Sequence, residues 1–514
     1  MPKPNADEIL TSKHIRTYIQ FGGPRPGNPV LYGGQDAQYL SVEGVGVPES
    51  GGVDPVFVPD PSIIGRYRLV GRKISPPDLA SATLKLLERH GSVPRQLIGI
   101  KCPFNIYQPS GKCKTLSDFL SGWTNYVLIY SYAEVSDKDL GTRTGWEDDN
   151  VEDSLSLTLA DVYPVGALVF GEAAAQQADR EVVDIVYGGG LQCGDCGPQD
   201  DGSKHIYAIT KSSGAASPGL PSEVIYSLDG GSVWGEAVIN GIGASADATF
   251  IDIVGDKMIV GVESEGAYYW STLTDAGVPG TFTKVVTGFV ATKNPTDVFV
   301  SNPREVYFSA RGGYVYKSTD ITAGVVAINA ASATSNDLLR IHGKDETIVA
   351  TGTVSTAIVS SNRGVSFSTV AGVISLVPVT VQAVSVLDNR RFWVGTNNGR
   401  VYYSSDGGAT WTQKSFSGAG AGSVRDIVFP TDEVGYFLHN TSAPAARIFS
   451  TWNGGEDWTM TAPRITNLPV FDYAGRIACP NTDVAGVSVN AVAVAGLAGD
   501  GVDGIVLIGY ASRL

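Results

Sequence analysis

The chain has 514 residues, a formal net charge of −15 at neutral pH and 17% charged residues. With 62 glycines and 27 prolines, its composition is typical of a protein built from strands and turns rather than of a helical enzyme. The acidic balance offers no basic face, so it excludes sequence-specific nucleic-acid binding as an expected function.

The amino-terminal segment carries no targeting signal that we recognise. Residues 1–8 lack an apolar core, so we expect no secretory signal peptide, and no later stretch is long enough to span a membrane. Five cysteines fit a reducing compartment without a disulfide framework. These features predict synthesis in a cytosol and no membrane partner.

Residues 1–180 predict a β-rich, sandwich-like assembly domain with extended arms. The arms are 19–32 and 53–61, whose prolines prevent them from forming a core alone and favour contact with a neighbouring molecule. Segment 79–90 fits either a helix or an alternating strand. The acidic run 147–153 fits a solvated loop or the lining of an acidic channel.

Four cysteines form a candidate metal site, and they lie in two compact loops. Cys193 and Cys196 form a Cys-x-x-Cys knuckle, while Cys102 and Cys113 flank a second loop. Four thiolates could hold a tetrahedral zinc, and the alternatives are unlinked thiols or a redox-sensitive pair. We expect no other cofactor, and Cys479 is interpreted as a core residue.

A turn motif recurs through residues 181–514. Its clearest copy is Ser-Ser-Asp-Gly-Gly-Ala-Thr-Trp at 404–411, and the acid or amide recurs at 229, 275, 320, 362, 406 and 453, a spacing of one propeller blade. The short acid or amide accepts backbone N–H groups, glycine supplies positive φ and the aromatic packs between strands. The residues assigned to these structural turns are Ser227, Asp229, Gly231, Trp234, Ser360, Asn362, Gly364, Phe367, Ser404, Asp406, Gly408, Trp411, Asn453, Gly455 and Trp458.

Short apolar strands precede these turns at a similar spacing. They begin near residues 184, 252, 297, 337, 383, 426 and 491, and further strands follow each of them. Four strands per unit predict an all-β domain at 181–514, a seven-bladed β-propeller. The last unit ends too early to have outer strands, so we expect the apolar stretch 155–170 to complete the ring.

The turn resembles the Asp-box, or bacterial neuraminidase repeat, of sialidases, sortilin-type receptors and photosystem II assembly factors. A sialidase would need three clamping arginines, a tyrosine nucleophile with its glutamate, and an early Arg-Ile-Pro motif. The nearest string here is Pro463-Arg464-Ile465-Thr466, and the spacing of Glu263, Glu265 and Tyr268 demands no catalysis. We therefore expect no enzyme, and we interpret the propeller arginines as surface residues: Arg311, Arg340, Arg400, Arg425 and Arg447.

The phrases at 22–30, 51–56 and 71–78 are similar to the amino-terminal part of structural tail proteins of tailed bacteriophages. This resemblance implies a tail-tube subunit of a virion, which stacks into rings with copies of itself and contacts other tail proteins. The propeller would then be an outward platform, with host-surface glycan as a candidate partner. The alternatives are an Asp-box hydrolase or lectin, and a scaffold of the photosystem II assembly factor type.

Overall fold

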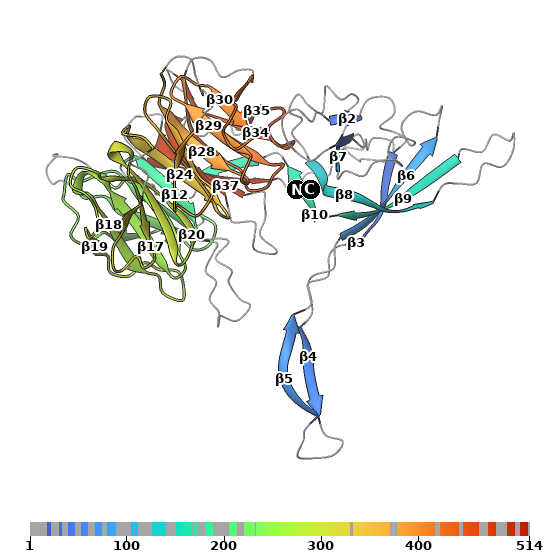
Figure 1. Ribbon diagram of the computed structural model, residues 1–514, viewed down its shortest axis with the longest axis horizontal. Coiled ribbons are helices and arrows are strands. Elements are labelled where there is room, and N and C mark those ends of the chain that lie inside the picture. The colour runs from blue at the N-terminus through green and yellow to red at the C-terminus, as the bar shows by residue number, and fades with distance from the viewer. Residues whose placement is uncertain are drawn as a thin grey trace. The chain divides into compact units, whose positions relative to one another are not determined.

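The computed structural model in Figure 1 divides into two compact units, Met1–Gly166 and Ala167–Leu514. The second unit begins before the expected residue 181 because strand β11 (Leu168–Glu172) pairs with β38 (Gly504–Ala511) near the end of the chain. In the first unit the structure describes the strands β1 to β10. In the second it describes β11 and residues 180–188, 205–212, 220–231, 233–328, 333–370, 374, 378–416, 422–441, 446–461, 471–479, 491–498 and 504–511.

The first unit contains an eight-stranded sheet. Its strand order is β2-β1-β7-β8-β9-β6-β3, and β10 also pairs with β8. The first half of the long strand β8 pairs with β7 and β10, and its second half pairs with β9, so β8 joins two parts of the sheet. The expected β-sandwich stays a prediction. The strands are β1 (Tyr18–Phe21), β2 (Val30–Tyr32), β3 (Leu40–Gly46), β6 (Ala80–Glu88), β7 (Phe104–Ser110), β8 (Tyr126–Asp139), β9 (Val151–Leu159) and β10 (Asp161–Gly166).

Two segments of this unit can be compared with the sequence expectation, the arm 19–32 and the ambiguous segment 79–90. The ends of the expected arm 19–32 are strands of the sheet, because β1 pairs with both β2 and β7 and Ile19 is fully buried. The ambiguous segment 79–90 forms strand β6, in which alternation places Leu84 in the core.

The second expected arm forms a separate hairpin. Strand β4 (Val53–Pro59) pairs with β5 (Tyr67–Ile74) in a two-stranded sheet of its own (Figure 1). Within the described strands, neither β4 nor β5 pairs with the eight-stranded sheet.

The second unit is made of seven four-stranded antiparallel sheets. Six of them use consecutive strands, as the spacing of the turns predicts. These blades are β12 (Val182–Tyr187), β13 (Ile206–Thr210), β14 (Glu223–Ser227) and β15 (Gly235–Val238); β16 (Phe250–Val254), β17 (Lys257–Val262), β18 (Ala267–Thr272) and β19 (Thr283–Val285); β20 (Pro295–Asn302), β21 (Glu305–Ala310), β22 (Val315–Ser318) and β23 (Val326–Ile328); β24 (Leu338–Lys344), β25 (Thr347–Gly352), β26 (Ala357–Ser360) and β27 (Ser368–Thr369); β28 (Val381–Val386), β29 (Phe392–Thr396), β30 (Val401–Ser404) and β31 (Thr412–Lys414); and β32 (Gly422–Val428), β33 (Gly435–Thr441), β34 (Ala446–Thr451) and β35 (Thr459–Thr461).

The seventh blade combines both ends of the unit. Its order is β11-β38-β37-β36, with β36 (Phe471–Ala478) innermost and β37 (Ala491–Ala498) second. The sequence interpretation began this blade one strand late, at residue 491. Only the outer strand is therefore supplied from the front of the unit, and β11 overlaps the expected segment 155–170 only from Leu168 onward.

The innermost strands close into a ring. Each of β12, β16, β20, β24, β28 and β32 contacts the innermost strand of the next blade, and β36 contacts β12. This cyclic order of four-stranded sheets is the architecture of a seven-bladed β-propeller.

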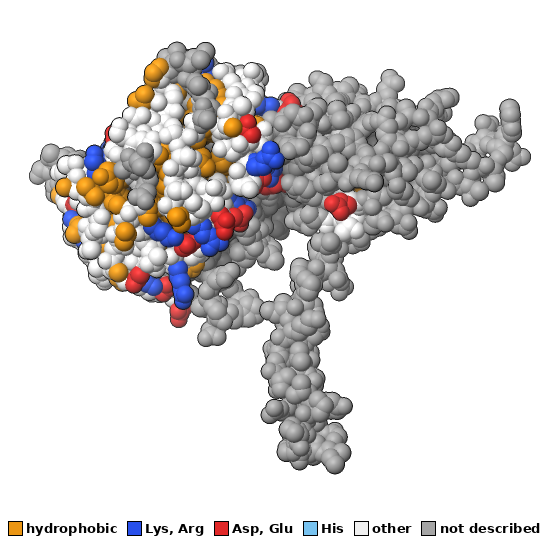
Figure 2. Space-filling model, viewed as in Figure 1, with side chains coloured by type: hydrophobic (Ala, Val, Ile, Leu, Met, Phe, Trp, Pro, Cys, Tyr) orange, Lys and Arg blue, Asp and Glu red, His pale blue; other side chains and the backbone are white. Residues whose placement is uncertain are grey.

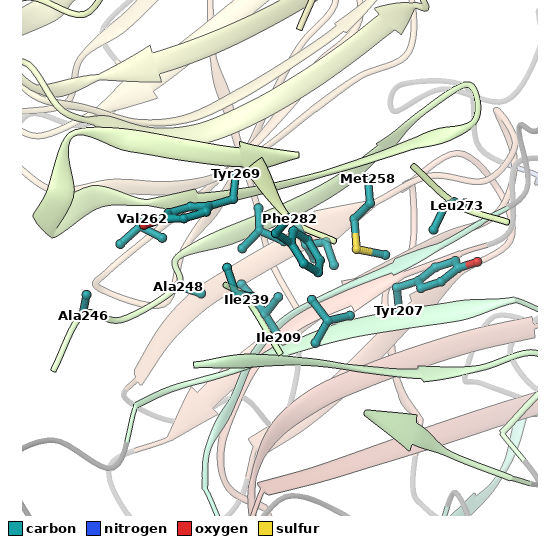
Figure 3. Close-up of a cluster of buried hydrophobic side chains, with 13 residues drawn as sticks. Tyr207, Ile209, Ile239, Ala246, Ala248, Met258, Val262, Tyr269, Leu273 and Phe282 are labelled. Atoms are coloured by element: carbon teal, nitrogen blue, oxygen red, sulfur yellow. The ribbon is translucent and has the colours of Figure 1, made fainter. Parts of the chain in front are cut away.

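Apolar side chains fill the spaces between the blades. Figure 3 shows the cluster between the first two, where Ile209 and Tyr207 of β13 face Met258 of β17 and Phe282. All four are at least 95% buried, so adjacent blades stabilise each other by burying apolar surface. In the described part of the chain, no helix is long and apolar enough to cross a membrane.

Candidate binding site in the propeller channel

A cavity of about 610 Å³ lies at the centre of the ring, and all seven innermost strands line it. Its lining begins at a level of charged side chains that includes Asp184 and Arg476. It continues along the strands to their carboxyl ends, where Tyr187, Gly255 and Asn302 line it. The cavity therefore has a charged end and an end lined in part by Gly255 and Pro303, which belong to the hairpins that follow β16 and β20.

Arg476 on β36 is the centre of the charged level. Its guanidinium lies 3.2 Å from Asp184, 2.5 Å from Asp297 and 3.7 Å from Asp426. Asp184 and Asp426 belong to the two neighbouring blades, whereas Asp297 on β20 belongs to neither. One side chain from the closing blade thus links three other blades across the channel.

The aspartates also join neighbouring blades through backbone groups. Ile185 N–H donates to one carboxylate oxygen of Asp184 (2.9 Å), and Ile251 N–H of the next blade donates to the other (3.0 Å). Asp426 accepts in the same way from Ile427 and from Ile477 of the next blade. These carboxylates satisfy backbone groups that would otherwise be buried without partners.

A local irregularity of the strands accompanies most of the charged residues. The pairing of the innermost strand shifts immediately before Asp184, Asp297, Arg340, Asp426 and Arg476. A bulge adds a residue to one strand and redirects the side chains beside it. Asp252 on β16 differs, because it lies in a regular register opposite Ile259.

Burial and neighbouring charges shift several pKa values at this level. Burial raises the pKa of Asp184 to about 6, although Arg476 opposes the shift. Burial, followed by the charges of Asp184 and Asp297, raises the pKa of Asp252 to about 7. Burial lowers the pKa of His342 to about 4, so this ring is neutral at neutral pH and its Nδ1 accepts from Val386 N–H.

The sequence interpretation placed Arg340 on the surface, and the structure contradicts it. Arg340 lines the cavity, its Nη1 donates to Leu339 O at 3.2 Å, and its Nε has no hydrogen-bond partner among the described residues. Burial, and then the charge of Arg476, lowers the pKa of Arg340. Sequence reasoning missed this site, although it had noted the recurring aspartates as strand markers.

The repeated turns lie elsewhere, between the third and fourth strands of four blades. In one of them Gly408 N–H donates to Ser404 Oγ (2.8 Å), Ser404 Oγ donates to Asp406 Oδ1 (2.9 Å), and Thr410 N–H donates to the same Oδ1 (2.8 Å). The turns at Asp229, Asn362 and Asn453 repeat these three bonds, with Thr451 in place of serine in the last.

The aromatic residues of these turns pack inward to different extents. Phe367 and Trp458 are at least 91% buried, while Trp234 and Trp411 are partly buried against the cores beside them. The glycines Gly231, Gly364, Gly408 and Gly455 all have positive φ. In each turn the serine or threonine hydroxyl and the acid or amide side chain bond to groups of the same turn.

The residues considered for glycoside hydrolysis do not converge. Tyr268 is fully buried and its hydroxyl donates to Ile321 O (2.7 Å). Glu263 pairs with Arg311 at 2.6 Å, and Glu265 instead accepts from Tyr269 and Lys284. The string 463–466 lies outside the described residues.

The cysteine site receives no structural description. Cys102, Cys113, Cys193 and Cys196 lie outside the described residues, in which no group of three or more potential metal ligands occurs. Cys479 is partly exposed and lines the channel cavity, and burial raises the pKa of its thiol.

Charges on the propeller surface are mixed. On the face shown in Figure 2, basic and acidic side chains lie close together between apolar ones. One ion-pair group joins three blades, since Arg311 contacts both Glu263 and Asp337, the latter at 3.1 Å.

No family model matches the chain, and no curated protein is similar to it. Among solved structures, the chain is similar to YCF48 bound to D1 peptide, with 12% identity, 68% of this chain and 96% of that chain covered, and a TM-score of 0.48. YCF48 from Cyanidioschyzon merolae gives 12% identity, coverages of 66% and 99%, and a TM-score of 0.47. U3-55K has 9% sequence identity, the match covers 66% of this chain and 98% of that chain, and the TM-score is 0.47.

Proposed function

We propose that this chain is a non-catalytic structural subunit that polymerises through its amino-terminal unit and carries the propeller as an appended platform. The class of assembly that fits best is the tail tube of a tailed bacteriophage. In this proposal the repeated turns belong to the Asp-box type, and their role is to hold the blades in shape.

The separate hairpin of β4 and β5 is the observation that supports polymerisation. A two-stranded sheet alone is at best marginally stable in water. Within the described strands, this hairpin has no partner sheet in its own chain. Both of its edges carry backbone groups that another copy of the chain could pair with, and the proline residues Pro55 and Pro59 limit uncontrolled pairing along β4.

The contacts of the propeller residues support a non-catalytic role. The hydroxyl of Tyr268 is used by a backbone carbonyl, and the two glutamates Glu263 and Glu265 are held by different cationic residues. The acidic balance of the chain also suits a tube through which DNA passes, since like charges prevent adhesion.

Electron microscopy of the purified full chain tests this function. We expect rings or tubes with the propeller as added density, together with a sedimentation profile of large species. A monodisperse monomer at all concentrations would overturn the proposal and favour a propeller scaffold of the photosystem II assembly factor type. Cleavage of a sialoside reporter would instead favour the hydrolase.

A further inference from the structure

We propose that the channel cavity binds one cationic group, an ammonium or guanidinium on a slim alkyl stem, with Asp252 as its carboxylate partner. This inference concerns the propeller alone and does not depend on polymerisation. It begins from the cavity, whose volume of about 610 Å³ lies in the range of small-molecule sites.

The charged end of the cavity has an excess of carboxylates. Asp184, Asp297 and Asp426 share Arg476, and Arg340 is the second guanidinium at this level. Among the described residues, no Lys, Arg or His nitrogen lies within 4 Å of the Asp252 carboxylate. Four carboxylates against two guanidiniums leave a negative field, which favours a positively charged ligand.

Asp252 faces the cavity in a way that leaves it available. Asp252 is partly exposed and lines the cavity. One carboxylate oxygen accepts from Ile253 N–H at 2.8 Å, and the carboxylate also accepts from the backbone N–H of Val300 on the next blade. A carboxylate has about four lone-pair positions, so the bonds from Ile253 and Val300 do not exhaust its capacity. A cation beside it would gain a charge-assisted hydrogen bond.

The walls of the cavity favour an alkyl stem rather than a bare ion. Toward the strand ends, the lining includes Val186, Ile253, Val300 and Val428, whose side chains are partly exposed. Methylene groups of a lysine- or arginine-like ligand would lie against these side chains while the charged head reaches Asp252. Asn302 and Ser301 line the same cavity and could contact polar groups nearer the stem.

Binding of a cation should be linked to the ionisation of Asp252. The other ionisable residues that line the cavity are Asp184 and Tyr187 on β12, Asp297 on β20, Arg340 and His342 on β24, Asp426 on β32, Arg476 on β36 and Cys479 after it, and the cavity-lining residue of β28 is the apolar Val384. Because burial raises the pKa of Asp252 to about 7, part of the population is protonated at neutral pH. A cation selects the ionised form, so binding releases a proton and is about tenfold tighter at pH 8 than at pH 6.

Titration calorimetry on the full chain tests this site, with n-butylammonium and n-butylguanidinium as probes and n-butanol as the neutral control. We expect the two cations to bind with proton release at pH 7, seen as a dependence of the heat on buffer ionisation enthalpy, and butanol not to bind. Asp252→Asn should weaken cation binding at least about tenfold and reduce its pH dependence, leaving only the smaller contribution of the other carboxylates. Asn can still accept the Ile253 N–H bond, so circular dichroism should show an unchanged fold.

The matched control is Asp256→Asn, in the same blade, because Asp256 is exposed and paired with Lys257. It should leave binding unchanged. Equal affinity of the Asp252→Asn variant and the parent chain, or no binding of either cation, would overturn the proposal. An acetylated Gly-Lys-Gly peptide amide that binds more tightly than n-butylammonium would identify a polypeptide as the source of the cation, and weaker binding would identify a free amine.

Discussion

Arg476 is the residue on which most of the buried charge in the propeller depends. Burial opposes its charge, but Asp184, Asp297 and Asp426 together raise its pKa, so it stays charged. A buried ion pair is a weak source of net stability, because desolvation offsets the attraction. Removing one partner is different, since the remaining charges are then left buried without compensation.

We therefore predict that Arg476→Ala destabilises the propeller by roughly 3–5 kcal/mol at pH 8. The penalty should shrink as the pH falls from 8 toward about 6. Burial raises the pKa of Asp184 to about 6 even with Arg476 opposing the shift, so without Arg476 this carboxyl takes up a proton at a higher pH and no longer needs a cation. Calorimetric unfolding of the full chain at pH 5 and pH 8 measures the difference.

Arg390→Ala is the control for this change, because Arg390 is exposed and its replacement removes one positive charge from the same unit. It should alter the unfolding temperature little at either pH. A penalty for Arg476→Ala that is equal at the two pH values would show that the carboxylates of the cluster do not govern its effect.

Gly455 illustrates a different single-residue constraint, imposed by packing. Its φ is +81°, and a Cβ atom there would lie 2.2 Å from the ring of Trp393, which is fully buried. Gly455→Ala should therefore cost roughly 2–4 kcal/mol, from backbone strain and overpacking together. Gly407→Ala, with φ +73° and its nearest contact at 3.4 Å, should cost only roughly 1–2 kcal/mol. Equal unfolding temperatures of the two variants would contradict the packing argument.

Single residues also show why part of the site could not be predicted. The aspartates at 184, 252, 297 and 426 recur at one strand position, and that recurrence was visible in the sequence. That these side chains gather around Arg476 could not be predicted. The cluster depends on the closed ring and on the ion pair between Arg476 of the last blade and Asp297, three blades away. Arg340 was misassigned for the same reason, since a lone arginine in a strand has no local signal of facing a channel.

At the level of elements, local pattern identified the strands better than their partners. The spacing of the turns predicted six blades of consecutive strands, because each blade pairs neighbours along the chain. The seventh blade was misread because β36 contains Gly475 and Arg476 and has two register shifts, which hide its apolar pattern. Both 151–159 and 168–172 are apolar enough to complete a sheet, and only tertiary pairing assigns the first to β6 and the second to β38.

Strand β11 makes the ring dependent on a contact between distant parts of the chain. We predict that replacing Leu168–Glu172 with a Gly-Ser segment of equal length lowers the unfolding temperature of the propeller and exposes the edge of β38, which favours aggregation. Calorimetry and light scattering of the full chain measure both effects.

The comparison for this change is the same replacement of Val326–Ile328, the outer strand β23 of an internal blade. That blade keeps three strands that are consecutive in the chain, so its unfolding temperature should fall by less. If the two replacements lower stability equally, β11 has no special part in ring closure.

For the whole molecule, the two units should make separable contributions. The propeller has its own closed core, while the hairpin of β4 and β5 has no partner sheet within the described part of its unit. A sheet of two strands gains stability when a further strand or surface covers it. If another copy of the chain covers this hairpin, then assembly requires the hairpin and does not require the propeller.

We therefore predict opposite results for two variants of the chain in electron microscopy. Replacement of residues 53–74 by a short Gly-Ser link should leave the spectrum and unfolding of the propeller intact and abolish rings or tubes. Removal of Ala167–Leu514 should leave assembly intact and narrow the particles, because the first unit retains its sheet and its hairpin. Tubes of unchanged form without the hairpin would mean that another edge of the described sheet, at β2, β3 or β10, joins the subunits. An unpaired strand edge is a backbone surface able to pair with another chain.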